Sequence, residues 1–499
     1  MLRAQGLSAA RRLRVALTPK TAMSARLLSG GLFSLAGALV TRSFGFALSL
    51  LIVRLLGRER FGEFTMVQST LGVLGTAAGM GLSATATKFI AEHRDQAPDR
   101  AGAVLGLVNA SALTVGLLIG VLCYAGADLL AAHVLKRPEL GSLLRVAALA
   151  IPITTLEGVQ SASLAGLEAF RRLAQISVAA AAVSLPVYVL GVYSDGLRGA
   201  VQAQVAGAGI ALTLSCWACR AECQKRGLRT NYGSMLAESR LIWLYSLPAL
   251  GGGLTYLTVF WAANLILVQA PDGYLQLGTL RVVDQLRTML VALPTVMLAP
   301  TFAIMANTVH QPAVLAKILE HSVASAGLIV FPAGLALTFC GPQLLAFLYG
   351  SDMAGSGVAL ACAMVVAGAQ ATGLGLGNVL SATGRMWLGF ALNLFWGLLF
   401  LGLCLALIPS RGTSGFLIAL AAAYLALNAL AYASFLARNS YLRPGRVFIP
   451  LGGYIAAVAA GVGVVPHLEP RLALAAGAGA ALLMAICLAR LARKALTPA

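Results

Sequence analysis

Long apolar blocks separated by short polar segments run through most of the chain. A helix that crosses a bilayer needs roughly 17–25 mostly apolar residues, and by that measure the blocks predict about fourteen membrane-spanning helices. The predicted spans are residues 30–53, 64–88, 103–125, 143–165, 173–193, 198–219, 244–268, 274–306, 317–339, 355–382, 386–408, 414–436, 447–465 and 472–490. The pattern therefore predicts an all-α polytopic membrane protein.

The composition agrees with this prediction. Hydrophobic residues make up 59% of the 499 residues and charged residues only 11%, whereas soluble domains carry about 25% charged residues. The net charge of +19 would suit a nucleic-acid partner, but the basic residues are scattered between apolar blocks instead of forming a patch. We therefore expect no nucleic acid partner, and we interpret the basic residues as determinants of membrane orientation.

With the N-terminus inside, most Lys and Arg fall in segments predicted to be cytoplasmic, including "RAECQKRGLR" at 220–229. The positive-inside rule therefore predicts that both termini are cytoplasmic. Residues 1–28 are basic, contain no acidic residue, and lack the apolar core and cleavage site of a signal peptide. We interpret them as a cytoplasmic tail. An organellar presequence, or a true start at Met23, are the alternatives.

Several kinds of chemistry have no support in the sequence. No GxxxxGK[ST] phosphate-binding loop occurs, and the loops are too short for a soluble catalytic domain. Cys216, Cys219 and Cys223 form a CxxCxxxC motif, but no His or second CxxC completes a metal site. The other cysteines are mostly isolated within apolar blocks, which suits small packing groups. We expect neither a metal, a cofactor nor a disulfide framework.

Similar segments recur in the two halves of the chain, which indicates an internal repeat. The paired segments are 126–135 with 341–350, 162–172 with 378–388, and 57–68 with 270–285. Each repeat holds six predicted spans, an even number, so the two repeats have one orientation and are related by a pseudo-two-fold axis along the membrane normal. We expect a cleft between them.

This repeat gives the predicted domain organisation. The units are a basic cytoplasmic N-terminal tail (1–28), an N-terminal six-helix lobe (29–219), an amphipathic cytoplasmic linker helix (220–243), a C-terminal six-helix lobe (244–437), and two additional transmembrane helices with a short cytoplasmic tail (438–499).

Charged side chains within the predicted spans mark the candidate site. A charge at the bilayer centre costs roughly 2.5–3.5 kcal/mol on insertion scales, so such residues usually face a wet cavity. At 100° per residue, Arg281, Asp284 and Gln285 share one helix stripe, and Arg287 lies at i+3 from Asp284. The residues expected to line a central cavity are Arg42, Gln68, Glu157, Arg281, Asp284, Gln285 and Arg287. Structural ion pairs, or positions nearer the interface, are the alternative interpretation.

Glycines and prolines within the spans suggest where the helices bend. Prolines free backbone groups and permit kinks, although a kink can also be static. The candidate hinge or gate residues are Pro248, Gly251, Gly252, Gly253, Pro294 and Pro300. In the second span, Gly72, Gly75 and Gly79 are small enough to let another helix approach closely.

The segment "LLIVRLLGRERFGEFTMVQSTLGVLGTAAGMGLSATATKFIAEH" (50–93) resembles the start of polysaccharide biosynthesis flippases. These proteins export lipid-linked oligosaccharides and belong to the superfamily that contains multidrug and toxin extruders and lipid II flippases. The residues that carry the resemblance are Arg54-Leu55-Leu56-Gly57, Phe61-Gly62-Glu63-Phe64, Gly79-Met80-Gly81-Leu82 and Lys88-Phe89-Ile90. The plan of six, six and two spans covers essentially the whole chain and agrees with this family.

The resemblance implies a V-shaped, alternating-access transporter in the bacterial inner membrane. Its substrate would be a polyprenyl-pyrophosphate-linked oligosaccharide for O-antigen, exopolysaccharide or capsule synthesis. In related flippases, arginines on the first and eighth spans line the central cavity, and Arg42 and Arg281 fit those places. The resemblance also implies contact with membrane lipid. The expected protein partners are glycosyltransferases and a polysaccharide polymerase, and the expected coupling ion is a proton or sodium.

Three rival functions stay open at this stage. An ion-coupled multidrug or metabolite exporter of the same superfamily should have an acidic, aromatic cavity, whereas the candidate residues here include three arginines and two carboxylates. A membrane-embedded glycan polymerase or ligase would need a sizeable external loop with catalytic groups. A structural scaffold for glycan export fits poorly with charges placed within spans.

Overall fold

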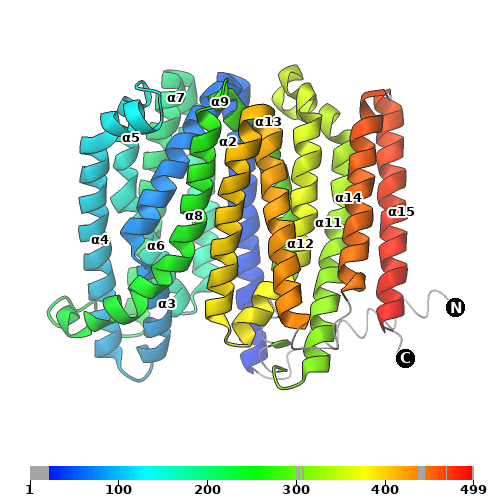
Figure 1. Ribbon diagram of the computed structural model, residues 1–499. Coiled ribbons are helices and arrows are strands. Elements are labelled where there is room, and N and C mark those ends of the chain that lie inside the picture. Colours follow the sequence, from blue (N-terminus) through cyan, green and yellow to red (C-terminus); the bar gives the residue numbers. More distant parts are fainter. Residues whose placement is uncertain are drawn as a thin grey trace.

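The computed structural model describes residues 22–298, 301, 304–305, 308–436, 444–467 and 469–496. Within these residues all regular structure is helical and no strand occurs, which confirms the all-α prediction. The long helices stand roughly side by side in one bundle (Figure 1). Their bounds are α2 Ala22–Gly79, α3 Leu82–His93, α4 Pro98–Leu129, α5 Leu140–Ala148, α6 Ala150–Gly166, α7 Phe170–Lys225, α8 Leu247–Val268, α9 Gly273–Met297, α11 Pro312–Tyr349, α12 Gly357–Ala382, α13 Met386–Leu436, α14 Gly445–Val464 and α15 Pro470–Leu496.

Short π- and 3₁₀-helical turns join some of these helices. The π-helical turns are Leu130–Val134 and Ile242–Ser246, and the 3₁₀ turns are Met235–Glu238, Ser351–Ser356 and Val465–His467. Among the described residues, nine helices are long and apolar enough to cross a membrane. The chain is therefore a multi-pass membrane protein.

Three of the longest helices contain a break at which one crossing ends and the next begins. An unbroken helix of the 58 residues of α2 would be about 87 Å long, far more than the roughly 30 Å of a hydrocarbon core. The backbone leaves the helical region at Gly57 in α2, at Asp195 and Gly196 in α7, and at Gly412 in α13. These breaks lie in the loops predicted between spans. The total of about fourteen crossings stays a prediction.

Two expected elements differ from the structure. The second span does not continue to residue 88, because Met80 (φ 42°) and Gly81 (φ 68°) turn the chain and start the separate helix α3. The single linker helix expected at 220–243 is also absent from this described segment. There α7 ends at Lys225, Gly227 takes a left-handed φ of 68°, and the Asn231 side chain accepts bonds from two following backbone N–H groups. Such an Asx turn competes with helix formation.

Backbone features recur in the two halves at one interval, which supports the internal repeat. Gly196 (φ 55°, ψ −126°) and Gly412 (φ 51°, ψ −126°) stand 216 positions apart and have nearly the same conformation. The positive-φ residues Glu168 and Gly384 stand at the same interval. A repeat of structure at a constant spacing is the signature of two copies of one unit.

The first half of the chain (29–219) and the second half (244–437) meet closely where the part of α2 after Gly57, the second crossing, packs against α9. A Cβ atom on Gly62 would lie 1.9 Å from the carbonyl oxygen of Tyr274, and one on Gly278 would lie 1.9 Å from that of Arg58. Only glycine allows backbones to approach so closely. The contact is also reciprocal, as a two-fold axis between the helices requires. Gly62 and Gly278 are themselves 216 positions apart.

Polar contacts fasten the halves at this end of the bundle, away from the first turns of α2 and the last turns of α15 (Figure 1). The Tyr274 hydroxyl donates to Leu135 O at 2.8 Å, and Arg54 Nε donates to Leu348 O at 2.6 Å. Within the first half, the buried Glu63 pairs with Arg137 at 2.9 Å beside these contacts. The halves are therefore closed against each other at this end.

Candidate functional site

A cavity of about 840 Å³ lies between the two halves. The second crossing within α2, together with α6 and α7, forms the wall of the first half. Helices α8 and α9, with Phe416 of α13, form the wall of the second half. A volume of this size is within the usual range for small-molecule sites. The cavity is therefore the candidate functional site, and its two walls differ in chemistry.

In the described part of the chain, the charged groups that line the cavity stand on α9. Arg287 is buried, with its side chain only 5% exposed, and its Nε donates to Asp284 Oδ1 at 2.7 Å. Arg287 also donates to the side-chain oxygen of Gln370 on α12. Arg281 is different, because its side chain is 46% exposed and its Nη1 lies 3.7 Å from Asp284 Oδ2. Asp284 thus neutralises Arg287 first and contacts Arg281 more weakly.

This arrangement leaves the cavity with an excess of one positive charge. Among the described residues that line it, Arg281, Asp284 and Arg287 are the charged ones. Because the short ion pair of Asp284 and Arg287 is nearly neutral as a unit, the accessible charge is the guanidinium of Arg281. A planar guanidinium presents several donors that match carboxylate or phosphate oxygens. The α9 wall is therefore suited to an anionic group.

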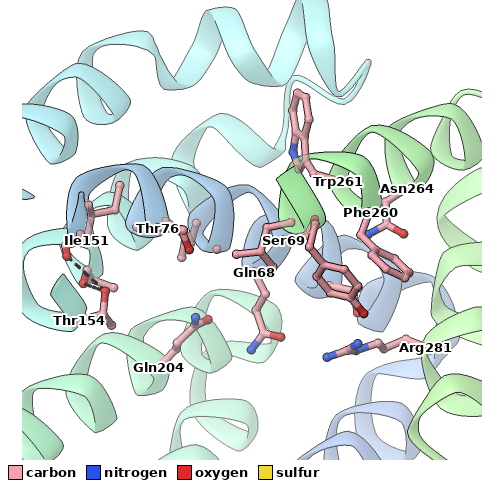
Figure 2. Close-up of a pocket in the computed structure, with 18 of the residues that line it drawn as sticks. Gln68, Ser69, Thr76, Ile151, Thr154, Gln204, Phe260, Trp261, Asn264 and Arg281 are labelled. Carbon is pink, nitrogen blue, oxygen red and sulfur yellow. Dashed lines mark hydrogen bonds between the residues drawn. The ribbon is translucent and has the colours of Figure 1, made fainter. Parts of the chain in front are cut away.

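The wall of the first half is polar and uncharged. Figure 2 shows Gln68 of α2 and Gln204 of α7 with their side chains directed into the same space as Arg281. Thr76 and Thr154 also line this side. Gly72 and Gly79 do not bring a helix close here, because a Cβ atom on either would meet nothing within 4 Å, and one on Gly75 would meet only the Thr154 hydroxyl, at 3.9 Å. Their small size leaves room in the cavity instead.

Aromatic side chains of α8 complete the lining. Tyr256, Phe260 and Trp261 face the cavity, and the ring centroids of Tyr256 and Phe260 lie 4.7 Å apart. Trp261 Nε1 donates to Thr70 Oγ1 at 3.1 Å, which ties α8 to the second crossing in α2. Asn264 lines the cavity one turn further along α8.

The structure brings four of the seven predicted cavity residues together in the lining, namely Gln68, Arg281, Asp284 and Arg287. The other three are placed beside it. Arg42 is exposed and its Nη1 donates at 3.0 Å to the carbonyl oxygen of Thr288, a lining residue. Gln285 faces Gly45 on α2.

Glu157 is the third predicted residue that stands outside the lining. It is half-buried between α6 and α7, where it accepts hydrogen bonds from Ser161 at 2.6 Å and Ser215 at 3.2 Å. Both partners belong to the first half of the chain. The contacts of Glu157 therefore join helices within that half.

Five of the six predicted hinge residues lie on α8 and α9. Pro248 is in the first turn of α8, followed by Gly251, Gly252 and Gly253. The chain just before them is bound to the first half, since Ser246 Oγ lies 2.6 Å from Thr85 Oγ1. Pro294 is buried inside α9, and Pro300 lies outside the described residues.

Sequence reasoning missed Gln204 and the lining residues of α8. The signal in the sequence was an amide within an apolar segment, since Asn264 stands alone and Gln204 stands two positions after Gln202. A stripe of polar residues marks a helix face only when several stand together, so single amides do not reveal which face is wet.

The sequence matches the polysaccharide biosynthesis protein family over residues 27–306. This match covers more than half of the chain. The protein belongs to this family. No curated protein matches the sequence.

Solved structures show the same fold. The lipid II flippase MurJ in an inward closed conformation is similar with a TM-score of 0.72 and 12% identity, over 93% of this chain and 99% of that one. An inward-facing multidrug resistance MATE family transporter has a TM-score of 0.67 and 14% identity, over 82% and 98% of the two chains. A transporter from Pyrococcus furiosus has a TM-score of 0.60 and 16% identity, over 83% and 95%. The last two are described as members of the MOP superfamily.

The chain therefore has the fold of the MOP superfamily transporters. Family and fold agree with the expectation of a membrane transporter.

Proposed function

We propose that the protein is a flippase for polyprenyl-pyrophosphate-linked oligosaccharide repeat units. It moves them from the cytoplasmic to the outer leaflet of a bacterial inner membrane for the synthesis of O-antigen, exopolysaccharide or capsule. The observation that carries this proposal is the half-exposed Arg281 in a cavity between the two halves of a polysaccharide biosynthesis family member.

Arg281 is the residue to which we assign the pyrophosphate. A pyrophosphate needs compensation of its charge inside the membrane, and the Arg287 charge is already compensated by Asp284. Arg42 contacts the carbonyl of the lining residue Thr288, so we assign it the second pyrophosphate contact. Asp284 holds Arg287 in place. Proton or sodium coupling has no assigned residue in this scheme.

The rest of the substrate follows from its chemistry. Hydroxyl-rich sugars suit the amides and aromatic rings of the cavity, while the polyprenyl chain stays among lipid tails. Outward movement of an anion is also favoured by an inside-negative membrane potential, by roughly 2.3 kcal/mol per charge per 100 mV. Rearrangement of the two halves would then expose the cavity to the other side.

The proposed topology has both termini in the cytoplasm. The lobes at 29–219 and 244–437 enclose the cavity, the segment 220–243 connects them on the cytoplasmic side, and 438–499 adds two helices outside the repeat. The end closed by Gly62 and Gly278 would then face outward. The wider export machinery would include glycosyltransferases and a polymerase.

The test is export by the Arg281→Ala variant in a strain that lacks the wild-type chain. We expect lipid-linked glycan to accumulate inside and surface glycan to fall at least tenfold, which corresponds to about 1.4 kcal/mol or more of lost interaction. Arg198→Ala is the matched control, because Arg198 is exposed beside the break in α7. Normal surface glycan in the Arg281→Ala strain contradicts the assignment. Efflux of cationic dyes that depends on this chain would favour the drug-exporter alternative.

A further inference from the structure

The two walls of the cavity offer different hydrogen-bonding chemistry. Arg281 on α9 has donors only, so its partner must be an acceptor. Across the cavity, Gln68 and Gln204 carry neutral amides, each with both a donor and an acceptor. Figure 2 shows these side chains directed into the same space. A ligand that fills the cavity therefore needs an acceptor group at the Arg281 end and, at the other end, a group that can hydrogen-bond with neutral amides.

Two oxygen atoms on the first-half side are buried without a partner. Gln204 Oε1 and Thr65 Oγ1 are inaccessible to solvent and make no hydrogen bond with any described residue. Both residues line the cavity, and Thr65 as a whole is only 6% exposed. Buried polar atoms in proteins nearly always have a partner. Because both residues line the cavity, a small turn of their side chains toward a hydrogen-bonding ligand group would give these atoms partners.

The chemistry of that ligand group follows from the atom types. Gln204 Oε1 is an acceptor and needs an O–H or N–H donor. An ionised pyrophosphate diester carries acceptors only, so it cannot satisfy this atom. Sugar hydroxyls and N-acetyl amides are donors and carry no charge. The Gln204 side of the cavity therefore fits a neutral sugar, whereas the Arg281 side fits a phosphate.

We propose that Gln204 and Thr65 form a sugar-binding subsite and that the substrate lies across the cavity in one direction. Its pyrophosphate is held by Arg281 on α9, and the sugar next to the pyrophosphate is held by α2 and α7. This inference rests on the proposed function. It adds the orientation of the substrate and a neutral hexose or N-acetylhexosamine as the class of sugar at this position.

The test compares binding of two lipids to the purified full-length chain by native mass spectrometry. The probes are undecaprenyl pyrophosphate and undecaprenyl pyrophosphate carrying one N-acetylglucosamine. Gln204→Leu should weaken binding of the sugar-bearing lipid by roughly five- to twentyfold, the effect of about one or two hydrogen bonds. It should leave binding of the bare pyrophosphate lipid unchanged. Gln202→Leu, on the exposed face of the same helix, should change neither.

A second variant, Thr65→Val, distinguishes the loss of a sugar contact from a folding defect in Gln204→Leu. Thr65→Val removes the unpartnered hydroxyl with little change in shape, and we expect the same selective loss in smaller measure. The inference is overturned if both variants bind the sugar-bearing lipid as well as the wild type does, or lose both lipids equally. Arg281→Ala tests the proposed function separately, because it should weaken both lipids. Unchanged binding of the bare pyrophosphate lipid to Arg281→Ala would contradict that function.

Discussion

Single residues on α9 show how similar side chains acquire different roles. Arg281 and Arg287 stand on one helix within two turns, yet one is 46% exposed and the other 5%. The sequence predicted that Arg281 and Asp284 share a face, because helical periodicity depends only on the local chain. It did not predict that Gln285 turns toward Gly45. That outcome depends on how another helix packs against α9, which periodicity does not encode.

The difference in exposure between Arg281 and Arg287 predicts that breaking the buried pair lowers stability, whereas replacing Arg281 lowers function and leaves stability nearly unchanged. Asp284→Asn leaves Arg287 buried without its carboxylate, and breaking a buried pair costs about 3–5 kcal/mol. We expect a clearly lower midpoint of thermal unfolding for the purified protein. Arg281→Ala should unfold near the wild-type temperature, since an exposed pair contributes roughly 0–1 kcal/mol. Equal midpoints for Asp284→Asn and the wild type would show that the buried pair is not a structural element.

At the scale of helices, hydrophobicity predicted where crossings lie and glycines determined where they end. The breaks at Gly57, Gly196 and Gly412 fall in predicted loops, and each of these glycines has a positive φ that other residues rarely adopt. The predicted end of the second span, residue 88, was wrong, because α2 ends at Gly79. The apolar run continues past Gly81 while the backbone turns there, and hydropathy alone does not register a turn within an apolar segment.

The start of α8 provides a test of flexibility. Ser246 is bound to α3 of the first half, whereas Trp261 faces the cavity further along. Gly251 lies between them, and a Cβ atom there would meet nothing within 4 Å. Gly251→Ala should therefore fold normally, stiffen the helix by up to about 1 kcal/mol, and slow glycan export severalfold.

The control for this variant is Gly402→Ala on α13, where a Cβ atom also meets nothing within 4 Å. It should export at the wild-type rate. The initial rate of surface glycan appearance after induction is the measurement. A Gly251→Ala protein that exports as fast as Gly402→Ala would exclude a hinge at this position.

At the scale of the whole molecule, the sequence predicted the internal repeat, but it did not predict that the two halves are closed against each other at one end of the bundle. Paired segments predicted two similar halves, and the reciprocal packing of Gly62 and Gly278 supports that arrangement. Closure at one end depends on contacts between distant segments, such as Tyr274 with Leu135 and Arg54 with Leu348. These contacts follow from the way the halves dock, which local patterns do not specify.

The central claim is that the chain carries a lipid-linked pyrophosphate across the bilayer and that Arg281 meets its charge. The direct measurement is transbilayer movement of a fluorescent undecaprenyl-pyrophosphate sugar in liposomes that contain the purified protein, followed by quenching of the outer-leaflet label. We predict that the wild type and Arg198→Ala expose the inner-leaflet label to the quencher. Arg281→Ala, at equal protein density, should leave it near the protein-free level. The account is contradicted if the wild type moves no lipid, or if Arg281→Ala moves it equally fast.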